Sequence, residues 1–168
     1  MCEISRENLF SKWQRQTLPR PYENSFRKMK KTGGEKWDFM KLDYKRRNKL
    51  IDNPELKFPN ADKATADDRK FTKYLFNPEN KNGYAKGVAF NSRLGYNKSN
   101  WKEFEKDVLS KAKLNPASFD RKTEHGDYYN LPMVMYGKKD NPMDLMTAWE
   151  VKGDTARLIT AFPNREKE

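Results

Sequence analysis

Hydroxyl groups in the last part of the chain are the first side chains that could do chemistry. Thr147 and Thr160 lie in two apolar arms around the sequence Lys-Gly-Asp-Thr at 152–155. A two-residue Gly-Asp turn predicts a hairpin whose register sets Thr147 beside Thr160. Two facing hydroxyls are either a cross-strand pair that stabilises a sheet or two groups of a reaction centre. The residues alone leave both interpretations open.

Basic and titratable side chains of the second half suit cleavage of RNA without a metal ion. In that reaction the 2′-hydroxyl attacks the adjacent phosphorus, and the site supplies a base, an acid and cations around the phosphorane. Histidine is the side chain that acid–base chemistry most naturally recruits, so His125 is a candidate, although its exposed, polar setting equally fits a surface residue. Lys86 and Arg93 would project from one side of a helix toward phosphates, or be ordinary solvated charges. Arg157 lies opposite Glu150 in the hairpin, where a cross-strand ion pair explains it equally well.

The charge of the chain favours a polyanionic partner. The formal net charge is +11 at pH 7, and residues 1–50 hold 14 Lys or Arg against 6 Asp or Glu, so that +8 lies there. Because a domain this basic attracts nucleic acid, RNA is the predicted partner, although a solvated basic face is the alternative. The residues predicted to contact RNA are Tyr84, Arg93, Trp149, and Lys45, Arg46 and Arg47 of a basic amphipathic segment.

The scarcity of metal-ligating side chains argues against a reaction that depends on a bound metal ion. With one histidine and one cysteine, the chain has no ligand set for a structural zinc site. Asp120, Glu124 and Asp127 have no spacing that would bring them together in a two-metal nuclease. We therefore expect neither a metal ion nor a cofactor. No stretch approaches the roughly 20 apolar residues of a membrane span, so we expect no membrane span. We also expect the protein to be a monomer.

The sequence pattern of the helices and strands that would position these groups predicts an α+β fold. A basic, mainly helical segment is predicted for residues 1–57, and a second domain for residues 58–168. Residues 52–67, with two prolines and several turn formers, are predicted to link the two. In the second domain, apolar spacing predicts three helices, which start at Asp67 or Asp68, near 83 and near 100.

A sheet is predicted to follow these helices. Short aromatic and apolar segments at 127–137, 143–151 and 156–163 predict three to four antiparallel strands. Because proline cannot donate to a ladder, Pro132 predicts that the first of these strands lies at an edge or begins after it.

Several short motifs follow one another between about residues 58 and 163. The positions that carry them are Asn60-Ala61-Asp62-Lys63-Ala64, Lys70-Phe71-Thr72-Lys73-Tyr74-Leu75-Phe76-Asn77-Pro78-Glu79, Lys86, Leu94-Gly95-Tyr96, Asn100-Trp101, Thr147-Ala148-Trp149 and Arg157-Leu158-Ile159-Thr160-Ala161-Phe162. Their joint spacing resembles a family of C-terminal domains found on bacterial polymorphic toxins and some phage-linked proteins.

The resemblance implies a fold and an activity. Such domains are similar to the barnase–EndoU–colicin–RelE ribonuclease group, which implies helices followed by an antiparallel sheet whose concave face cuts RNA without metal. It favours a functional role for at least one of the two threonines. The residues predicted to be catalytic are Lys86, Thr147, Arg157 and Thr160, which occupy matching motif positions, and His125, which is chosen for its acid–base chemistry.

This chain departs from the family pattern at two places. Lys86 is followed by Gly87 where the family has alanine, and the usual His-Pro after Asn-Pro-Glu is Asn80-Lys81 here. If the family histidine is catalytic, His125 or Lys86 has to take over its role.

The leading hypothesis is a metal-independent ribonuclease toxin that cuts tRNA or another structured RNA through 2′-OH attack to a cyclic phosphate. It would be delivered from a producer and act in the target-cell cytoplasm, with residues 1–57 as an entry, delivery or RNA-binding extension. An immunity protein that blocks so basic a toxin would be acidic. The alternatives are a non-catalytic nucleic-acid-binding or phage-associated protein, and an interaction module that docks on an acidic partner.

Overall fold

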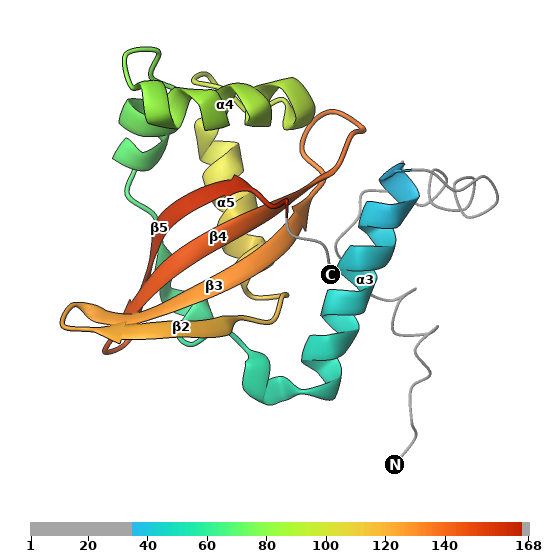
Figure 1. Ribbon diagram of the computed structural model, residues 1–168, viewed down its shortest axis with the longest axis vertical. Helices are drawn as coiled ribbons and strands as arrows, with labels where there is room; N and C mark the ends of the chain where they lie inside the picture. Colours follow the sequence, from blue (N-terminus) through green and yellow to red (C-terminus); the bar gives the residue numbers. More distant parts are fainter. Residues whose placement is uncertain (1–34, 166–168) are drawn as a thin grey trace.

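A sheet built by the C-terminal half of the chain carries the rest of the structure. The computed structural model describes residues 35–165 and has the predicted α+β fold, with helices followed by a sheet (Figure 1). Predictions that concern residues 1–34 lie outside the described residues. In chain order the elements are α3 (Glu35–Asp52), η1 (Pro54–Leu56), η2 (Ala61–Lys63), β1 (Ala64–Thr65), η3 (Lys70–Leu75), α4 (Lys81–Leu94), α5 (Trp101–Ala112), β2 (Ser118–Thr123), β3 (Gly126–Met135), β4 (Met143–Lys152) and β5 (Thr155–Pro163).

The sheet is larger than predicted and is mixed. Its five strands have the order β1-β5-β4-β3-β2, in which β2 to β5 are antiparallel and β1 runs parallel to β5. The prediction of three to four antiparallel strands missed the parallel strand. β1 has only two residues, and β2 is exposed at five of its six positions. Neither strand therefore shows the apolar alternation by which a strand is recognised.

Pro132 was predicted to put its strand at an edge of the sheet or to precede it, but β3 begins at Gly126 and lies between β4 and β2, so this prediction was wrong. β2 pairs with β3 only between Gly126 and Asn130, so the second half of β3 has β4 alone as a partner. Pro132 sits in that second half, opposite Met146 of β4. A proline is tolerated in this half of β3 because only one neighbouring strand pairs with it there.

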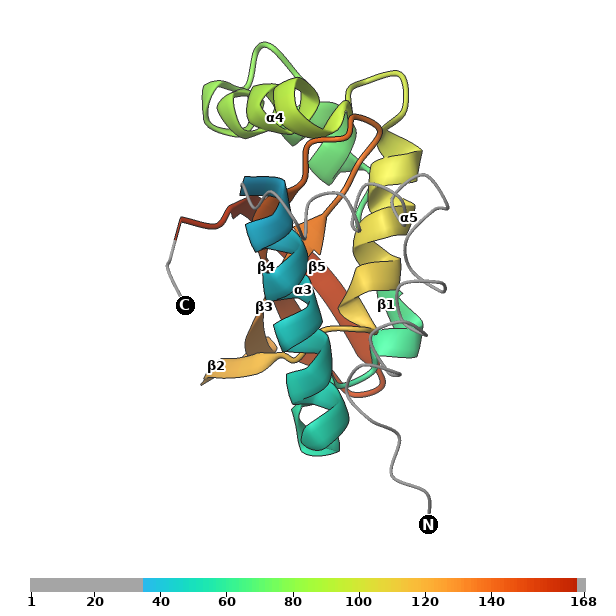
Figure 2. The ribbon, with the colours of Figure 1, turned by 90° about the vertical axis from the view of Figure 1, so that its right-hand side faces the viewer.

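The main core lies between one face of the sheet and the helices behind it (Figures 1 and 2). The ring of Phe104 in α5 is its centre, stacked on Tyr96 with 4.5 Å between centroids and meeting Phe90 of α4 edge-on at 5.1 Å. Phe58 is also fully buried, with its ring centroid 5.1 Å from that of Trp149. Phe58 lies within the predicted second domain, and its burial shows that the later part of the predicted linker, residues 52–67, packs against the sheet.

Helix α3 packs along the side of the sheet away from the main core. Met40 contacts Val134 and Tyr136 in a second apolar cluster. Beside that cluster Arg46, which is 3% exposed, forms a bidentate ion pair with the buried Asp144 of β4, with Nη2 2.7 Å from Oδ2. Helix α3 is thus joined to the sheet by both apolar and charged contacts.

The β4–β5 hairpin contains a bulge that changes the predicted register. Near the turn the pairing is as predicted, with Trp149 opposite Leu158 and Glu150 opposite Arg157. Ile159 is then an extra residue, so that Ala148 pairs with Thr160 and Thr147 pairs with Ala161. Because successive residues of a strand point to opposite faces, this one-residue shift places the two threonines on opposite faces of the sheet. The predicted Thr147–Thr160 pair was wrong.

Candidate active site

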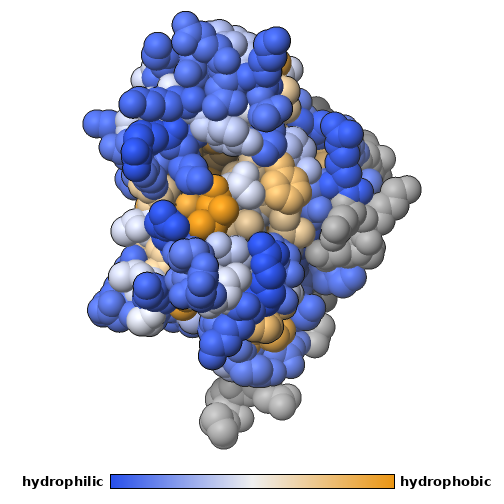
Figure 3. Space-filling model, turned by 60° about the vertical axis from the view of Figure 1, so that its left-hand side comes forward, coloured by the Kyte–Doolittle hydropathy of each residue, from blue (hydrophilic) through white to orange (hydrophobic). Residues whose placement is uncertain are grey.

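Three of the five predicted catalytic residues gather at one pocket beside the outer edge of β5. The pocket has a volume of about 540 Å³ and lies between η3, the start of α4 and β5. Figure 3 shows this side of the molecule hollowed, with apolar surface inside a hydrophilic rim. The residues that line it are Asp67, Arg69, Lys70, Lys73, Tyr74, Asn80, Arg157, Ile159 and Thr160. Arg157 and Thr160 are therefore part of its wall, and Lys86 contacts that wall through Tyr74.

The pocket is strongly cationic. Four of its lining residues are basic, and Asp67 is its one carboxylate. A side-chain hydrogen bond from Arg69, with a second from its backbone, lowers the pKa of Asp67 to about 2, so this carboxylate stays ionised and offsets Arg69. Arg157 is half-exposed and makes the predicted cross-strand ion pair with Glu150 at 3.2 Å. The remaining positive charge favours binding of an anion such as phosphate.

Lys86 and Tyr74 form a hydrogen-bonded pair at the wall of the pocket. The Lys86 ammonium donates to the Tyr74 hydroxyl over 2.8 Å, and its Nζ lies 5.1 Å from the centroid of the same ring. The Phe162 ring of β5 is the next aromatic neighbour, 5.9 Å from that Nζ. A hydroxyl held by an ammonium group can pass on a proton and be resupplied through the same bond. Tyr74 was not among the predicted catalytic residues.

Two glycines of α4 bring η3 close enough for this pair to form. η3 is a short π-helix, a widened turn that often occurs at functional sites. A Cβ added at Gly83 would lie 2.3 Å from the carbonyl oxygen of Tyr74, and one at Gly87 only 1.7 Å from that of Leu75. Any side chain at these positions would push η3 away. The departure at Gly87 from the expected alanine is therefore what allows the close approach.

Thr147 is a buried structural residue of the sheet. Its side chain is fully buried; its hydroxyl donates to the Leu131 carbonyl oxygen over 2.6 Å and accepts from the Trp149 indole N–H over 2.7 Å. It lies on the core face, whereas the pocket lies beyond the edge of β5. The prediction that Thr147 is catalytic was wrong, because its hydroxyl is satisfied by the protein and is not accessible to RNA.

The two threonines should respond differently to the same substitution. Thr147→Val leaves the indole N–H and a buried carbonyl without their partner, which costs about 1–3 kcal/mol of stability. Thr160→Val keeps the β-branched shape at a half-buried position and should leave the melting temperature unchanged. If the pocket cuts RNA, as the sequence predicts, loss of one hydrogen bond of about 1.4 kcal/mol should lower the rate of cleavage about tenfold. Thermal melting and a cleavage assay on both variants test this. Equal melting temperatures would contradict the structural role of Thr147.

His125 lies away from the pocket. It occupies the two-residue turn between β2 and β3, its side chain is 70% exposed, and its Nε2 lies 3.3 Å from Glu124. The pocket is bounded by η3, α4 and β5 instead. The prediction that His125 is catalytic therefore finds no geometric support, and the surface interpretation fits.

The predicted RNA contacts are spread over the molecule. Trp149 is fully buried and Arg46 is held by Asp144, so the prediction that they bind RNA was wrong. Arg93 is held by Glu35 at 2.8 Å and by the Pro142 carbonyl oxygen at 2.9 Å, so it joins α4 to other elements. The remaining predicted contacts, at least partly accessible and outside the pocket, are Tyr84, Lys45 and Arg47. Burial also lowers the pKa of the Arg47 guanidinium.

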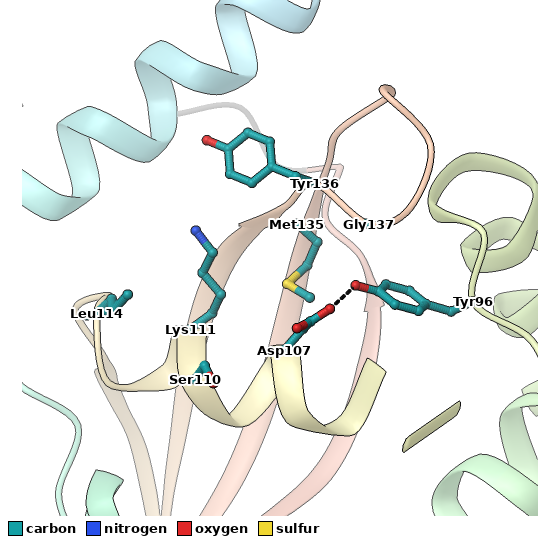
Figure 4. Close-up of a pocket in the computed structure, with 8 residues that line it drawn as sticks. All are labelled: Tyr96, Asp107, Ser110, Lys111, Leu114, Met135, Tyr136 and Gly137. Atoms are coloured by element: carbon teal, nitrogen blue, oxygen red, sulfur yellow. Dashed lines mark hydrogen bonds between the residues drawn. The ribbon is translucent and has the colours of Figure 1, made fainter. Parts of the chain in front are cut away.

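A second cavity, of about 250 Å³, lies between α5 and the end of β3 (Figure 4). The Tyr96 hydroxyl donates to Asp107 inside it, and Lys111 lies 4.9 Å from the centroid of the Tyr136 ring. Lys111 and Tyr136 also contact Asp43 of α3. Its polar groups thus hold helices together, and none of the predicted site residues lines it.

Within residues 35–165, no three His, Cys, Asp or Glu side chains are grouped as metal ligands, and no helix is long and apolar enough to cross a membrane. The fold and site define an α+β protein with a cationic, hydroxyl-lined pocket at a sheet edge. The chain belongs to the family described as Domain of unknown function (DUF6883), whose model matches residues 57–165. No curated protein and no solved structure matches the chain.

Proposed function

We propose that this protein is a metal-independent ribonuclease whose active site is the pocket between η3 and β5. The observation that carries the proposal is the gathering, from separate parts of the chain, of basic side chains and two hydroxyls around one cavity. Cations and donors around a phosphate stabilise the charge that develops on phosphorane oxygens. A hydrogen-bonded Lys–Tyr pair beside them provides a route for a proton.

The reaction assigns a task to each group. The ribose 2′-oxygen bonds to the adjacent phosphorus, the bond from phosphorus to the 5′-oxygen breaks, and a 2′,3′-cyclic phosphate remains. Arg157, Lys70 and Lys73 neutralise the phosphorane, and Thr160 donates a hydrogen bond to it. Tyr74 gives its proton to the leaving 5′-oxygen and takes one from Lys86. The proton of the 2′-hydroxyl passes to water in the open pocket, from which Lys86 is reprotonated.

The proposed biological setting is that of a toxin. The formal charge of +11 suits RNA, with tRNA or another structured RNA as substrate, and also suits an acidic immunity protein that covers the cationic pocket. The motifs that resemble those of toxin domains lie within residues 57–165, the region that the family model matches. In this proposal the protein is delivered from a producer and acts as a monomer in the target-cell cytoplasm.

Cleavage should persist in EDTA. Purified protein incubated with total tRNA in excess EDTA is expected to give discrete fragments that end in a 2′,3′-cyclic phosphate or its hydrolysis product, because side chains supply all the charge that the reaction needs. Gel electrophoresis and mass spectrometry of the termini measure this. Strict dependence of cleavage on magnesium, or fragments with a 3′-hydroxyl end, would contradict the proposed mechanism.

RNA binding without cleavage is the second candidate function. It is favoured by one observation: the only histidine of the chain lies outside the pocket, which leaves lysine and tyrosine as the proton-transferring groups. The same tRNA assay separates the two functions. Intact RNA with a shifted mobility on a native gel supports the binding protein, and fragments support the enzyme.

A further inference from the structure

The pocket contains one aliphatic side chain among its charges, and the bulge of β5 places it there. Trp149 pairs with Leu158 and Ala148 pairs with Thr160, so Ile159 is the unpaired residue between them. Its neighbours lie on the two sheet faces, with Leu158 buried in the core. The half-buried Ile159 lines the pocket instead. Re-aiming one side chain next to a site is a common use of a bulge.

We infer that Ile159 forms a subsite for the base of a nucleotide whose phosphate binds the surrounding cations. This inference rests on the proposed function. It defines the substrate more closely, because it makes the nucleotide on one side of the cut bond a specific contact rather than a length of charged backbone.

The chemistry of the lining selects such a ligand over a simple anion. Lys70, Lys73 and Arg157 account for a phosphate, but a phosphate or a sugar phosphate would leave Ile159 in water. A nucleotide joins an anion to a flat, largely apolar ring within one molecule. Placing the ring on Ile159 removes apolar surface of both from water, and this contributes affinity that inorganic phosphate cannot have. A volume of about 540 Å³ is within the range of small-molecule sites.

The walls of the pocket also restrict how the ring can lie. Tyr74 is held on one side by Lys86, and a Cβ on Gly83 would lie 2.6 Å from its ring, so this wall is packed and fixed. Asn80 caps α4 by accepting from the Gly83 N–H over 3.1 Å, which fixes the wall beside it. A pocket with fixed walls discriminates between rings of different size better than a mobile surface does.

The test is a comparison of ligands on an Ile159→Thr variant. Threonine keeps the branched shape that strands favour while it replaces the apolar end of the side chain with a hydroxyl. Binding of inorganic phosphate, ribose 5-phosphate and each of the four nucleoside 3′-monophosphates is measured by calorimetry. The matched control is Ile51→Thr, because Ile51 is 40% exposed at the end of α3 and lies outside the pocket.

The wild type is expected to bind at least one nucleoside monophosphate about tenfold more tightly than ribose 5-phosphate. Ile159→Thr should remove most of this advantage and leave phosphate affinity unchanged, and Ile51→Thr should change neither. Equal wild-type affinity for ribose 5-phosphate and all four nucleotides would overturn the inference. Equal losses for phosphate and nucleotide in Ile159→Thr would also overturn it.

The outcomes separate this inference from the ribonuclease proposal, because the binding measurement needs no cleavage. Nucleotide binding that depends on Ile159, combined with intact tRNA, supports the subsite and rejects the enzyme. Cleavage that is unchanged in rate and base preference in Ile159→Thr supports the enzyme and rejects the subsite.

Discussion

Replacing Lys86 by methionine is expected to lower the rate of RNA cleavage by about 10²–10⁴, the usual contribution of proton transfer by a positioned side chain. Methionine keeps most of the length and the apolar character of the lysine stem, but it lacks the Nζ that lies over the rings of Tyr74 and Phe162. The charge and the 2.8 Å hydrogen bond to Tyr74 are lost. Single-turnover cleavage of labelled tRNA measures the effect, and thermal melting checks that the fold is intact.

Two further variants make this experiment decisive. Lys81→Met removes the same charge from an exposed position of the same helix, and it should cut RNA nearly as fast as the wild type. Tyr74→Phe should be slow, and its combination with Lys86→Met should be no slower than the worse single variant, because the two residues act as a unit. Normal cleavage by Lys86→Met would remove the pair from the mechanism. Additive losses would mean that the two residues act separately.

The second large effect is expected from Gly87→Ala. In an ordinary helix this change stabilises, since alanine is favoured over glycine by about 1 kcal/mol. Here the new Cβ would lie 1.7 Å from the Leu75 carbonyl oxygen, which belongs to backbone and cannot turn aside. η3 must move, which should cost about 1–3 kcal/mol of stability. The movement would also pull Tyr74 from its place, and a 1 Å displacement can lower a rate 10²-fold.

Thermal unfolding and tRNA cleavage on Gly87→Ala measure both effects together. Asn82→Ala is the control, because Asn82 is exposed in the first turns of α4 and also gains helix propensity. It should melt at or above the wild-type temperature and cut RNA normally. A Gly87→Ala protein that melts higher than the wild type and keeps its activity would show that α4 and η3 do not approach so closely.

The parts of the fold that follow apolar spacing could be predicted from the sequence. In α5, Phe104 and Val108 recur at helical spacing and are buried, and the three strands β3, β4 and β5 coincide closely with their predicted segments. β2 could not be found this way, because its residues are exposed and its pairing with β3 is decided by tertiary contacts. The bulge at Ile159 was also missed, since no residue type requires one there.

Some residues of the candidate site could be predicted from sequence motifs, and others depend on how the elements pack. Lys86, Arg157 and Thr160 belong to motifs that lie far apart in the chain, and the fold brings them to one pocket. Tyr74 belongs to one of the same motifs, but its role depends on the close approach of η3 to α4. Thr147 was grouped with Thr160 because the bulge in β5, which turns Thr160 to the opposite face of the sheet, was missed, and His125 was chosen because its chemistry rather than its location was considered.

The attachment of α3 bears on where this protein can be divided. The family model begins at residue 57, whereas the sheet is held by Arg46 and Met40 from before that point. Removal of α3 would leave Asp144 without its guanidinium and would expose Val134 and Tyr136 to water. The segment that the family shares therefore begins later in the chain than the segment that packs together as one folded unit. Experiments on the proposed activity should therefore use a protein that includes α3.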